Sequence, residues 1–192
     1  MRNNETGRSM VEMLGVLAII GVLSAGGLAG YSKAMFKHKL NSTMEQISIM
    51  VTGVRTAYGQ KGNYDELSLT NAQKVGAIPA TVTANPFKGT IELAQASAKS
   101  GAADTTAFTL KYTGIPNEAC VALATADFGS GAGSGFIGVD VGNSSTVNVG
   151  DVRVVDNGSA TTRGEGYPYL MSDAIAACKA TNDNATIIWK FY

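Results

Sequence analysis

The stretch Met13–Gly30, MLGVLAIIGVLSAGGLAG, decides how this chain folds, because its 18 positions hold no charged residue. Twelve of the 18 residues are apolar, five are glycine and one is serine. This length is at the short end of what a membrane-spanning helix needs. A secretory signal has a shorter apolar core before a small-x-small site, which Ser24-Ala25-Gly26 matches only loosely. The helical pattern continues past Gly30, which favours an anchor.

Beyond the anchor, apolar residues recur with the spacing of an amphipathic helix. They stand four and three residues apart at Leu40, Met44, Ile47, Val51, Val54 and Tyr58. Gly59 and Gly62 then interrupt the pattern. We expect one helix from near Ser9 to near Tyr58, roughly 75 Å long at 1.5 Å per residue. Its first half is apolar all round and its second half on one face.

The remainder of the chain has the pattern of a small domain that mixes helices and strands. Short helices are expected at Leu69–Val75, capped by Thr70, and from a cap at Ser172 to Ala180. Strands are expected at Thr90–Leu93, Ala107–Tyr112, Val147–Val155 and Thr186–Tyr192, whereas Cys120–Ala124 fits a helix or a strand. A long helix followed by an antiparallel sheet predicts an α+β fold.

The composition excludes some classes of protein. The 192 residues contain 15 basic and 15 acidic side chains, so the net charge is zero. Residues 1–41 nevertheless carry +3, and the remainder carries −3. The apolar fraction of 45% argues against disorder, and the absence of a basic excess argues against a nucleic-acid binder.

Metal and cofactor sites are not expected. His38 is the only histidine, so a zinc site of the usual type lacks ligands. The aspartates Asp127, Asp140, Asp151 and Asp156 do not have calcium-loop spacing. Gly133–Gly138 matches G-x-G-x-x-G, but the following residues do not have a helical pattern, as a nucleotide site requires. We interpret Gly129–Gly142 as an exposed surface loop.

Catalysis is not expected either. The sequence provides no set of nucleophile, base and orienting group, and His38 stands between Lys37 and Lys39 just past the anchor, where a solvated side chain is expected. The prediction is a protein that is not an enzyme.

A carboxylate stands directly before the anchor, in Gly7-Arg8-Ser9-Met10-Val11-Glu12. Such a group is costly in hydrocarbon without a partner, although it also favours the amino end of a helix through the dipole. Gly, four residues, Glu and an apolar run resemble the class III signal of type IV prepilins. Most members of that family have Phe or another apolar residue where Arg8 stands.

The resemblance implies a separate role for each segment of the chain. Residues 1–7 are a leader that a prepilin peptidase removes after Gly7, and Arg8 becomes the N-methylated amino terminus. Glu12 neutralises the terminal amine of a neighbouring subunit during assembly. Residues 8–58 are a spine helix with the membrane anchor at 13–30, and residues 59–192 are the globular head.

The head resembles the type IVb pilins over nearly its whole length, although their leaders tend to be longer. The segments that carry the resemblance are Leu69–Ala72, Gly76–Pro79, Asn85–Gly89, Phe108–Pro116 leading to Cys120, and Ala176–Cys178 leading to Trp189. In an exported head, Cys120 and Cys178 are expected to form a disulfide that bounds a surface-exposed region. The alternative is two free thiols in a cytoplasmic protein.

These features predict a structural subunit of a type IVb-like pilus, with a pseudopilin of a type II secretion system as the alternative. Pseudopilin heads commonly lack the cysteine pair. The expected location is the inner membrane for the precursor and the cell exterior for the fibre. Expected partners are further copies of the chain, the peptidase, the assembly machinery and the bilayer. Lys33, Lys37 and Lys39 are candidates for contacts with anionic lipid headgroups or for salt bridges between subunits.

Overall fold

The computed structural model describes the backbone at residues 5–98, 104–129, 135–142, 169–179 and 181–192. Side chains are described in these ranges from Met10 onward, with the exception of Thr181. The chain divides into two units, Met1–Lys39 and Leu40–Tyr192. One helix, α1 (Glu5–Tyr58), contributes to both. It ends at the predicted residue and begins four residues before the expected Ser9.

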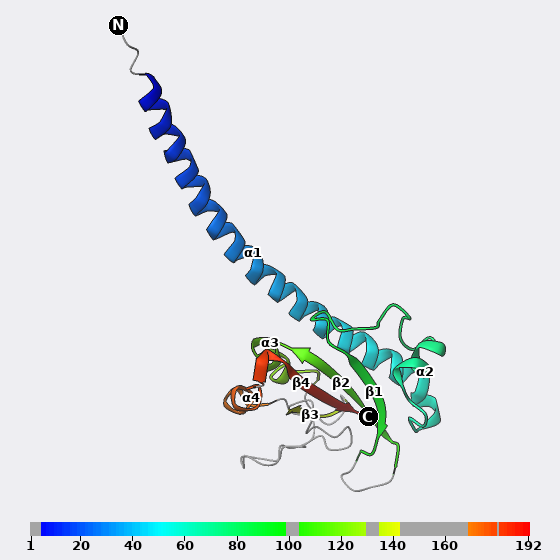
Figure 1. Ribbon diagram of the computed structural model, residues 1–192. Helices are drawn as coiled ribbons and strands as arrows, with labels where there is room; N and C mark the ends of the chain where they lie inside the picture. The colour runs from blue at the N-terminus through cyan, green and yellow to red at the C-terminus, as the bar shows by residue number, and fades with distance from the viewer. Residues whose placement is uncertain (1–4, 99–103, 130–134, 143–168, 180) are drawn as a thin grey trace. The chain divides into compact units, whose positions relative to one another are not determined.

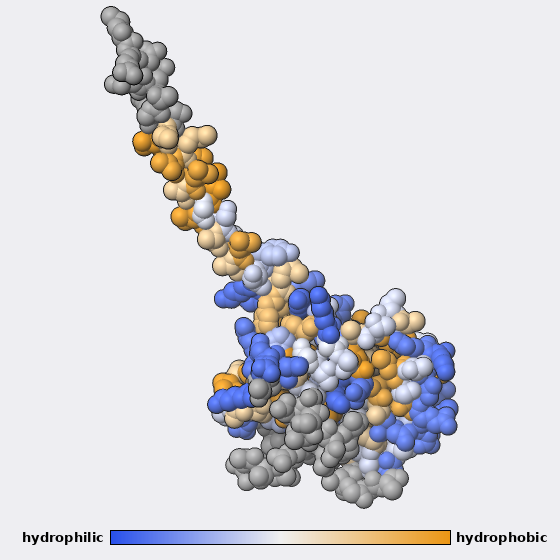
Figure 2. Space-filling view, viewed as in Figure 1, coloured by the Kyte–Doolittle hydropathy of each residue, from blue (hydrophilic) through white to orange (hydrophobic). Residues whose placement is uncertain are grey.

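The described part of the first unit is the amino-terminal part of α1. Among the described residues, α1 is the one helix long and apolar enough to cross a membrane. Its large apolar side chains between Met10 and Leu28 are 53–75% exposed in the single chain. Figure 2 shows this stretch in mostly hydrophobic colour, with a few paler residues between. A surface of this kind marks contact with a membrane or another protein.

The second unit combines the rest of α1 with a sheet and short helices. The following elements are η1 (Gly59–Lys61), α2 (Leu69–Lys74), β1 (Ile91–Ala96), β2 (Ala107–Ile115), α3 (Asn117–Ala124), β3 (Phe136–Gly142), α4 (Met171–Ala177), η2 (Thr181–Asp183) and β4 (Ala185–Phe191). The strands form one antiparallel sheet in the order β1-β2-β4-β3 (Figure 1). The predicted α+β fold is confirmed.

The second half of α1 packs against one face of the sheet. Tyr112 of β2 is fully buried, and its hydroxyl donates a hydrogen bond to Oε1 of Gln46 at 2.8 Å. The same hydroxyl lies 3.4 Å from Sδ of Met50. Trp189 of β4 meets the Tyr112 ring edge-on, with ring centroids 5.4 Å apart. The helix is therefore held to the two central strands by apolar packing and a buried polar contact.

The predicted amphipathic stripe forms the helix side of this core. Four of its six residues are buried, namely Ile47, Val51, Val54 and Tyr58, whereas Leu40 and Met44 are half-buried. Gly59 begins η1, and Gly62 ends it in the left-handed conformation with φ of 69°. A left-handed residue is easily provided by glycine, so the two glycines end the helix as the sequence predicts.

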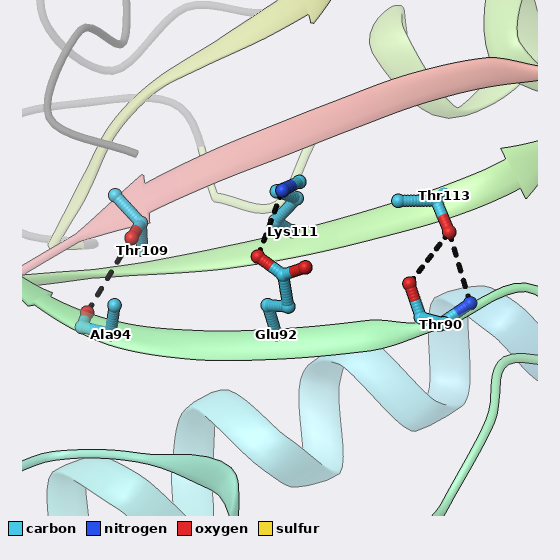
Figure 3. Close-up of polar contacts among 6 residues, drawn as sticks. All are labelled: Thr90, Glu92, Ala94, Thr109, Lys111 and Thr113. Atoms are coloured by element: carbon cyan, nitrogen blue, oxygen red, sulfur yellow. Dashed lines mark hydrogen bonds and ion pairs between the residues drawn. The ribbon is translucent and has the colours of Figure 1, made fainter. Parts of the chain in front are cut away.

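The opposite face of the sheet is polar along β1 and β2 (Figure 3). Lys111 alternates with Tyr112 and therefore points away from α1. Its ammonium lies 2.8 Å from the carboxylate of Glu92, its partner in the strand register. Nearby, the hydroxyls of Thr90 and Thr113 lie 2.7 Å apart. These cross-strand pairs fix the register of the edge strand.

Two predicted helix caps are wrong, although α2 begins at the expected Leu69. The hydroxyl of Ser68, not Thr70, caps α2 by accepting a hydrogen bond from the Asn71 amide at 3.2 Å. Thr70 lies inside the helix, where its hydroxyl cannot reach that amide in capping geometry. For α4, Ser172 lies in the first turn and Leu170 is at the cap position. The helix ends at Ala177, before the expected Ala180, which lies outside the described residues.

The predicted surface loop Gly129–Gly142 is partly wrong, because Phe136–Gly142 forms strand β3 beside β4. Phe136, Ile137 and Val139 are buried at no more than 3% exposure. The glycines of this segment hide its apolar residues in the sequence, and pairing with β4 stabilises the strand. The ambiguous Cys120–Ala124 segment belongs to helix α3, and the strand expected at Val147–Val155 lies outside the described residues.

The loop that follows α2 lies against α1, where the two backbones come into close contact. A Cβ atom built on Gly53 would lie 1.9 Å from the carbonyl oxygen of Ala77. Real Cβ contacts are never this short, so only glycine permits the contact without a backbone shift. Ile78, the next residue along the loop, is 1% exposed and belongs to the core.

We predict that Gly53→Ala destabilises the head, because its methyl group would push the Ala77 backbone off α1. The expected loss in the free energy of unfolding is about 1–3 kcal/mol, as for overpacked cores. Urea unfolding of the full chain in detergent, followed by circular dichroism, measures it. Gly59→Ala is the matched control, since no atom lies within 4 Å of its added Cβ. Equal stability of the two variants would contradict this account.

Candidate functional site

The three residues expected to act in processing and assembly all belong to α1. Gly7 and Arg8 lie in its first turns, and Glu12 follows on the same helix with an exposed side chain. Arg8 and Glu12 are four residues apart, which places both positions on one face of the helix. The apolar stretch Met13–Gly30 begins directly after Glu12. The carboxylate therefore stands at the edge of the surface that needs apolar cover.

The two cysteines form the predicted disulfide. Cys120 of α3 and Cys178, the residue that caps the end of α4, have Cα atoms 5.8 Å apart. The bond closes a loop with a sequence separation of 58 residues. Both residues are buried, at 0% and 2% exposure. The bond therefore joins two helices in the core and is shielded from solvent.

Two hydrogen bonds connect residues from later in the chain to the two ends of α3. The Asp183 carboxylate accepts a hydrogen bond from the backbone amide of Asn117, the first residue of α3. A carboxylate is favoured there by the helix dipole as well as by the hydrogen bond. At the other end, the Tyr169 amide donates to the carbonyl of Ala124 at 3.0 Å. The Tyr169 hydroxyl donates to Asp140 of β3 at 3.2 Å.

These hydrogen bonds could not be predicted from the sequence. Asn182 and Asp183 adopt left-handed backbone angles, with φ of 63° and 52°. Asn and Asp tolerate that conformation better than other non-glycine residues, so the Asn182-Asp183 pair was a signal for a turn. Nothing in the local pattern connects the pair to Asn117, which is 66 residues away.

Arg55 is a second feature that the sequence did not single out. Its Nε donates to the carbonyl oxygen of Tyr192 at 2.8 Å, and its guanidinium lies 5.5 Å from the ring centroid of Phe191. Burial lowers its pKa, while Tyr64 raises it to a smaller extent. A Cβ on Gly135 would lie 2.3 Å from the guanidinium, so glycine allows this approach. Arg55 thereby links α1 to the end of β4 and the start of β3.

A cavity of about 320 Å³ lies beside Arg55, between α1 and the residues that follow α3. Its walls combine apolar and polar side chains, among them Ile47, Phe128 and Asp127. The buried Nη2 of Arg55 forms no hydrogen bond within the described residues. Because that atom is covered by protein, it is not offered to a molecule in the cavity. We therefore assign Arg55 a structural role.

The candidate ligand motifs do not form sites in the described residues. In this part of the chain, no group of three or more His, Cys, Asp or Glu residues is placed to hold a metal ion. Asp127 accepts a hydrogen bond from the Gly129 amide, and Asp140 accepts one from Tyr169. Asp151 and Asp156 lie outside the described residues. The G-x-G-x-x-G motif leads into strand β3, not into a helix, and His38 is exposed on α1.

Comparisons with known proteins agree with this architecture. Residues 37–191 match the family model described as PilS N terminal. The chain is 25% identical over 195 residues to the major structural subunit of bundle-forming pilus from Escherichia coli O127:H6 (strain E2348/69 / EPEC), covering 96% of this chain and 93% of that protein. It is 25% identical over 132 residues to the toxin coregulated pilin of Vibrio cholerae serotype O1, covering 65% and 58% of the two chains.

Among solved structures, the model is similar to the crystal structure of TcpA, a type IV pilin from the El Tor biotype of Vibrio cholerae. The TM-score is 0.55 at 19% sequence identity, with 81% of this chain and 99% of that chain covered. At this identity the likeness shows the fold, which is that of a type IV pilin. With the family match, it follows that the chain belongs to the PilS N-terminal family and is a type IV pilin of the type IVb kind.

We predict that removing the disulfide by Cys120→Ser and Cys178→Ser lowers the free energy of unfolding by about 4 kcal/mol, on the chain-entropy estimate for a loop of this size. Urea unfolding of the full chain in detergent measures the loss. Adding reductant to the double variant is the control and should change nothing further, whereas the wild type should lose stability. Alkylation of both cysteines in native wild type without reductant would refute the pairing.

Proposed function

We propose that this chain is a structural subunit of a type IVb-like pilus. It is inserted in the inner membrane as a prepilin, cleaved after Gly7 and polymerised into a fibre on the cell surface. The observation that carries the proposal is the similarity over 96% of the chain to a protein named as the major structural subunit of a pilus. That relative is matched over 93% of its own length, so anchor and head are both included.

The exposed apolar surface of α1 supports both stages of this function. Fully burying a large apolar side chain gains about 1.5–3 kcal/mol, and the stretch from Met10 to Leu28 exposes eleven of them. Lipid provides the cover in the precursor, and neighbouring copies of α1 provide it in the fibre. The subunit can leave the bilayer because it exchanges one apolar environment for another.

Processing would act at the start of α1. A prepilin peptidase on the cytoplasmic side removes residues 1–7, so that Arg8 becomes the amino terminus and the acceptor for methylation. Cleavage removes Arg2 and Glu5 together and leaves the side-chain net charge of the chain unchanged. The new terminal ammonium then lies one helical turn before Glu12.

Assembly would depend on Glu12. In the fibre its carboxylate pairs with the terminal ammonium of a neighbouring subunit, which brings two opposite charges together in a medium of low dielectric. Removing one partner of such a pair costs about 3–5 kcal/mol, because the other charge is left buried and unpaired. The pair therefore acts as a check on register, since a subunit that is out of register leaves both charges unmatched.

The location of the chain in fibres tests the function directly. Surface fibres sheared from cells and probed with an antibody against the head should contain this chain at its processed length. Absence from such fibres, together with loss of protein secretion on deletion of the gene, would favour the type II secretion pseudopilin and overturn the proposal.

We predict that Gly7→Val blocks processing, because the peptidase requires the small residue before the cut. Intact mass and amino-terminal sequencing of the membrane-bound chain measure the outcome, with a start at Arg8 for the wild type and an uncut chain for the variant. Gly21→Val is the matched control, since it makes the same change on α1 away from the cut and should be processed normally. Cleavage of Gly7→Val at the wild-type position would contradict the assignment.

We predict that Glu12→Gln is processed normally but reduces fibre yield at least tenfold, because the terminal ammonium of the neighbour loses its partner. A loss of 1.4 kcal/mol per contact already gives a factor of ten. Electron microscopy and quantification of sheared fibres measure the yield. Glu45→Gln makes the same change at an exposed position on α1 and should leave the yield unchanged. Wild-type fibre yield from Glu12→Gln would exclude the assembly role.

A further inference from the structure

Glu12 stands among side chains that need apolar cover. Met10, Val11, Met13 and Leu14, on either side of it, are 65–71% exposed in the single chain. When lipid or a neighbouring α1 covers them, the carboxylate enters a medium of low dielectric, where an unpaired charge is very costly. Glu12 therefore needs a cation that keeps its charge when it is buried.

Few cations on α1 are within reach of this carboxylate. No lysine, arginine or histidine occurs between Glu12 and Lys33, and Lys33 stands about 32 Å further along the helix at 1.5 Å per residue. Once residues 1–7 are removed, residue 8 alone provides positive charge near Glu12. It provides two cationic groups, the terminal ammonium and the Arg8 guanidinium.

The two groups differ in how firmly they keep their charge. An α-amino group has an ordinary pKa of about 7.7–8.0, so burial readily neutralises it. A guanidinium stays protonated throughout the range of pH that proteins tolerate. It is also weakly hydrated and presents parallel N–H donors to the two oxygens of a carboxylate. Of the two cations, Arg8 is therefore better suited to a contact with apolar surroundings.

The number of charges leads to the same choice. Two cations stand against one carboxylate at the start of each processed chain, so an assembly of identical chains would leave one positive charge per subunit without a partner. The amino group can release a proton and still donate a hydrogen bond, whereas the guanidinium cannot lose its charge. The contact becomes neutral when Arg8 and Glu12 carry its two charges.

The helix gives residue 8 a suitable register. Arg8 and Glu12 belong to α1 and are one turn apart on one face. Two parallel copies of α1 that are shifted by about 6 Å along their axis therefore bring Arg8 of one copy level with Glu12 of the other. Neighbouring helix axes are about 8–10 Å apart. The terminal nitrogen belongs to the backbone, close to its own axis, whereas an arginine has a long stem that can span such a gap.

We propose that the Arg8 guanidinium of one subunit binds the Glu12 carboxylate of its neighbour in the fibre, beside the terminal amino group, and makes this contact independent of the charge of that group. The inference rests on the proposed cleavage after Gly7 and on the proposed polymerisation. A second cation at the amino end of a helix is disfavoured by the helix dipole, and the Glu12 carboxylate offsets that cost. Arg8 would thus have a role at a position where most type IV pilins have an apolar residue.

The pH dependence of fibre stability tests the proposal. Sheared fibres are incubated in a mild detergent at constant ionic strength between pH 6.5 and pH 9.5, and the sedimenting fraction is measured. A contact that needs the ammonium is present at low pH and is lost as the pH rises above about 8. Wild-type fibres should change by less than twofold over this range, whereas Arg8→Gln fibres should lose at least fivefold. Copies of α1 bring no other titratable group to the contact before Lys33.

Two further variants control for other effects of pH. Lys61→Gln removes one positive charge at an exposed position of the head and should follow the wild type. Arg8→Lys restores a cation with an ordinary pKa of about 10.4 and should keep most of the wild-type stability at pH 9.5. Equal profiles of Arg8→Gln and wild type would overturn the proposal. A fivefold loss in the wild type would overturn it as well, whether or not Arg8→Gln is processed.

A crosslink determines whether the contact joins two chains. A carbodiimide couples an amine to a carboxylate that touches it, so fibres of Arg8→Lys should give covalent dimers. Mass spectrometry of the dimer band should find the substituted side chain linked to Glu12. Linkage only within single chains would overturn the proposal, because residue 8 would then serve the carboxylate of its own helix.

The outcomes separate this contact from the function on which it rests. Absence of the chain from sheared fibres would refute the proposed pilus subunit and the Arg8 contact with it. Fibres that contain the chain with Arg8 as its first residue, but dissolve as the pH rises above 8, would refute the Arg8 contact alone.

Discussion

The contact between the second half of α1 and the β2–β4 face of the sheet is the interaction on which the rest of the head depends. Tyr112 is central to it, because its ring is buried against Trp189 while its hydroxyl donates to Gln46. Burial raises the pKa of this phenol and keeps it a neutral donor. With the helix fixed on one face, the polar pairs of β1 and β2 must lie on the other, and α2 follows through the Gly53 contact. The second half of this helix thereby orients every layer of the head.

Much of this fold could be predicted from the sequence where the signal is local and periodic. The stripe ending at Tyr58 gave the helix and its end, and the alternation in β2 and β4 located the two central strands within a few residues. Strand β3 could not be predicted, because its glycines resemble a loop and its pairing with β4 is a tertiary effect. The predicted helix caps were wrong for a similar reason. Ser68 and Thr70 are both good capping residues, and the backbone alone decides which hydroxyl reaches the free amide.

In the candidate site, too, the features with a local sequence signal could be predicted and the long-range contacts could not. The cysteine pair could be predicted because only two cysteines exist and an exported head favours their oxidation. Gly7, Arg8 and Glu12 came from a short motif, and the roles proposed for them concern a peptidase and neighbouring subunits, which lie outside a single chain. Arg55 and Asp183 escaped prediction altogether. Each acts across more than 60 residues of sequence, Arg55 on the carbonyl of Tyr192 and Asp183 on the amide of Asn117. Such contacts leave no local pattern.

In the proposed surface fibre, the disulfide has a consequence for how the subunit withstands proteases. Any single backbone cut between Cys120 and Cys178 leaves the two fragments joined through the sulfur atoms. The fragment after the cut still contains β4, which lies between β2 and β3 in the sheet. Nicked subunits would therefore keep their central strand and stay in the fibre. Damage in this interval would be visible only after reduction, when the head separates into two pieces on a denaturing gel.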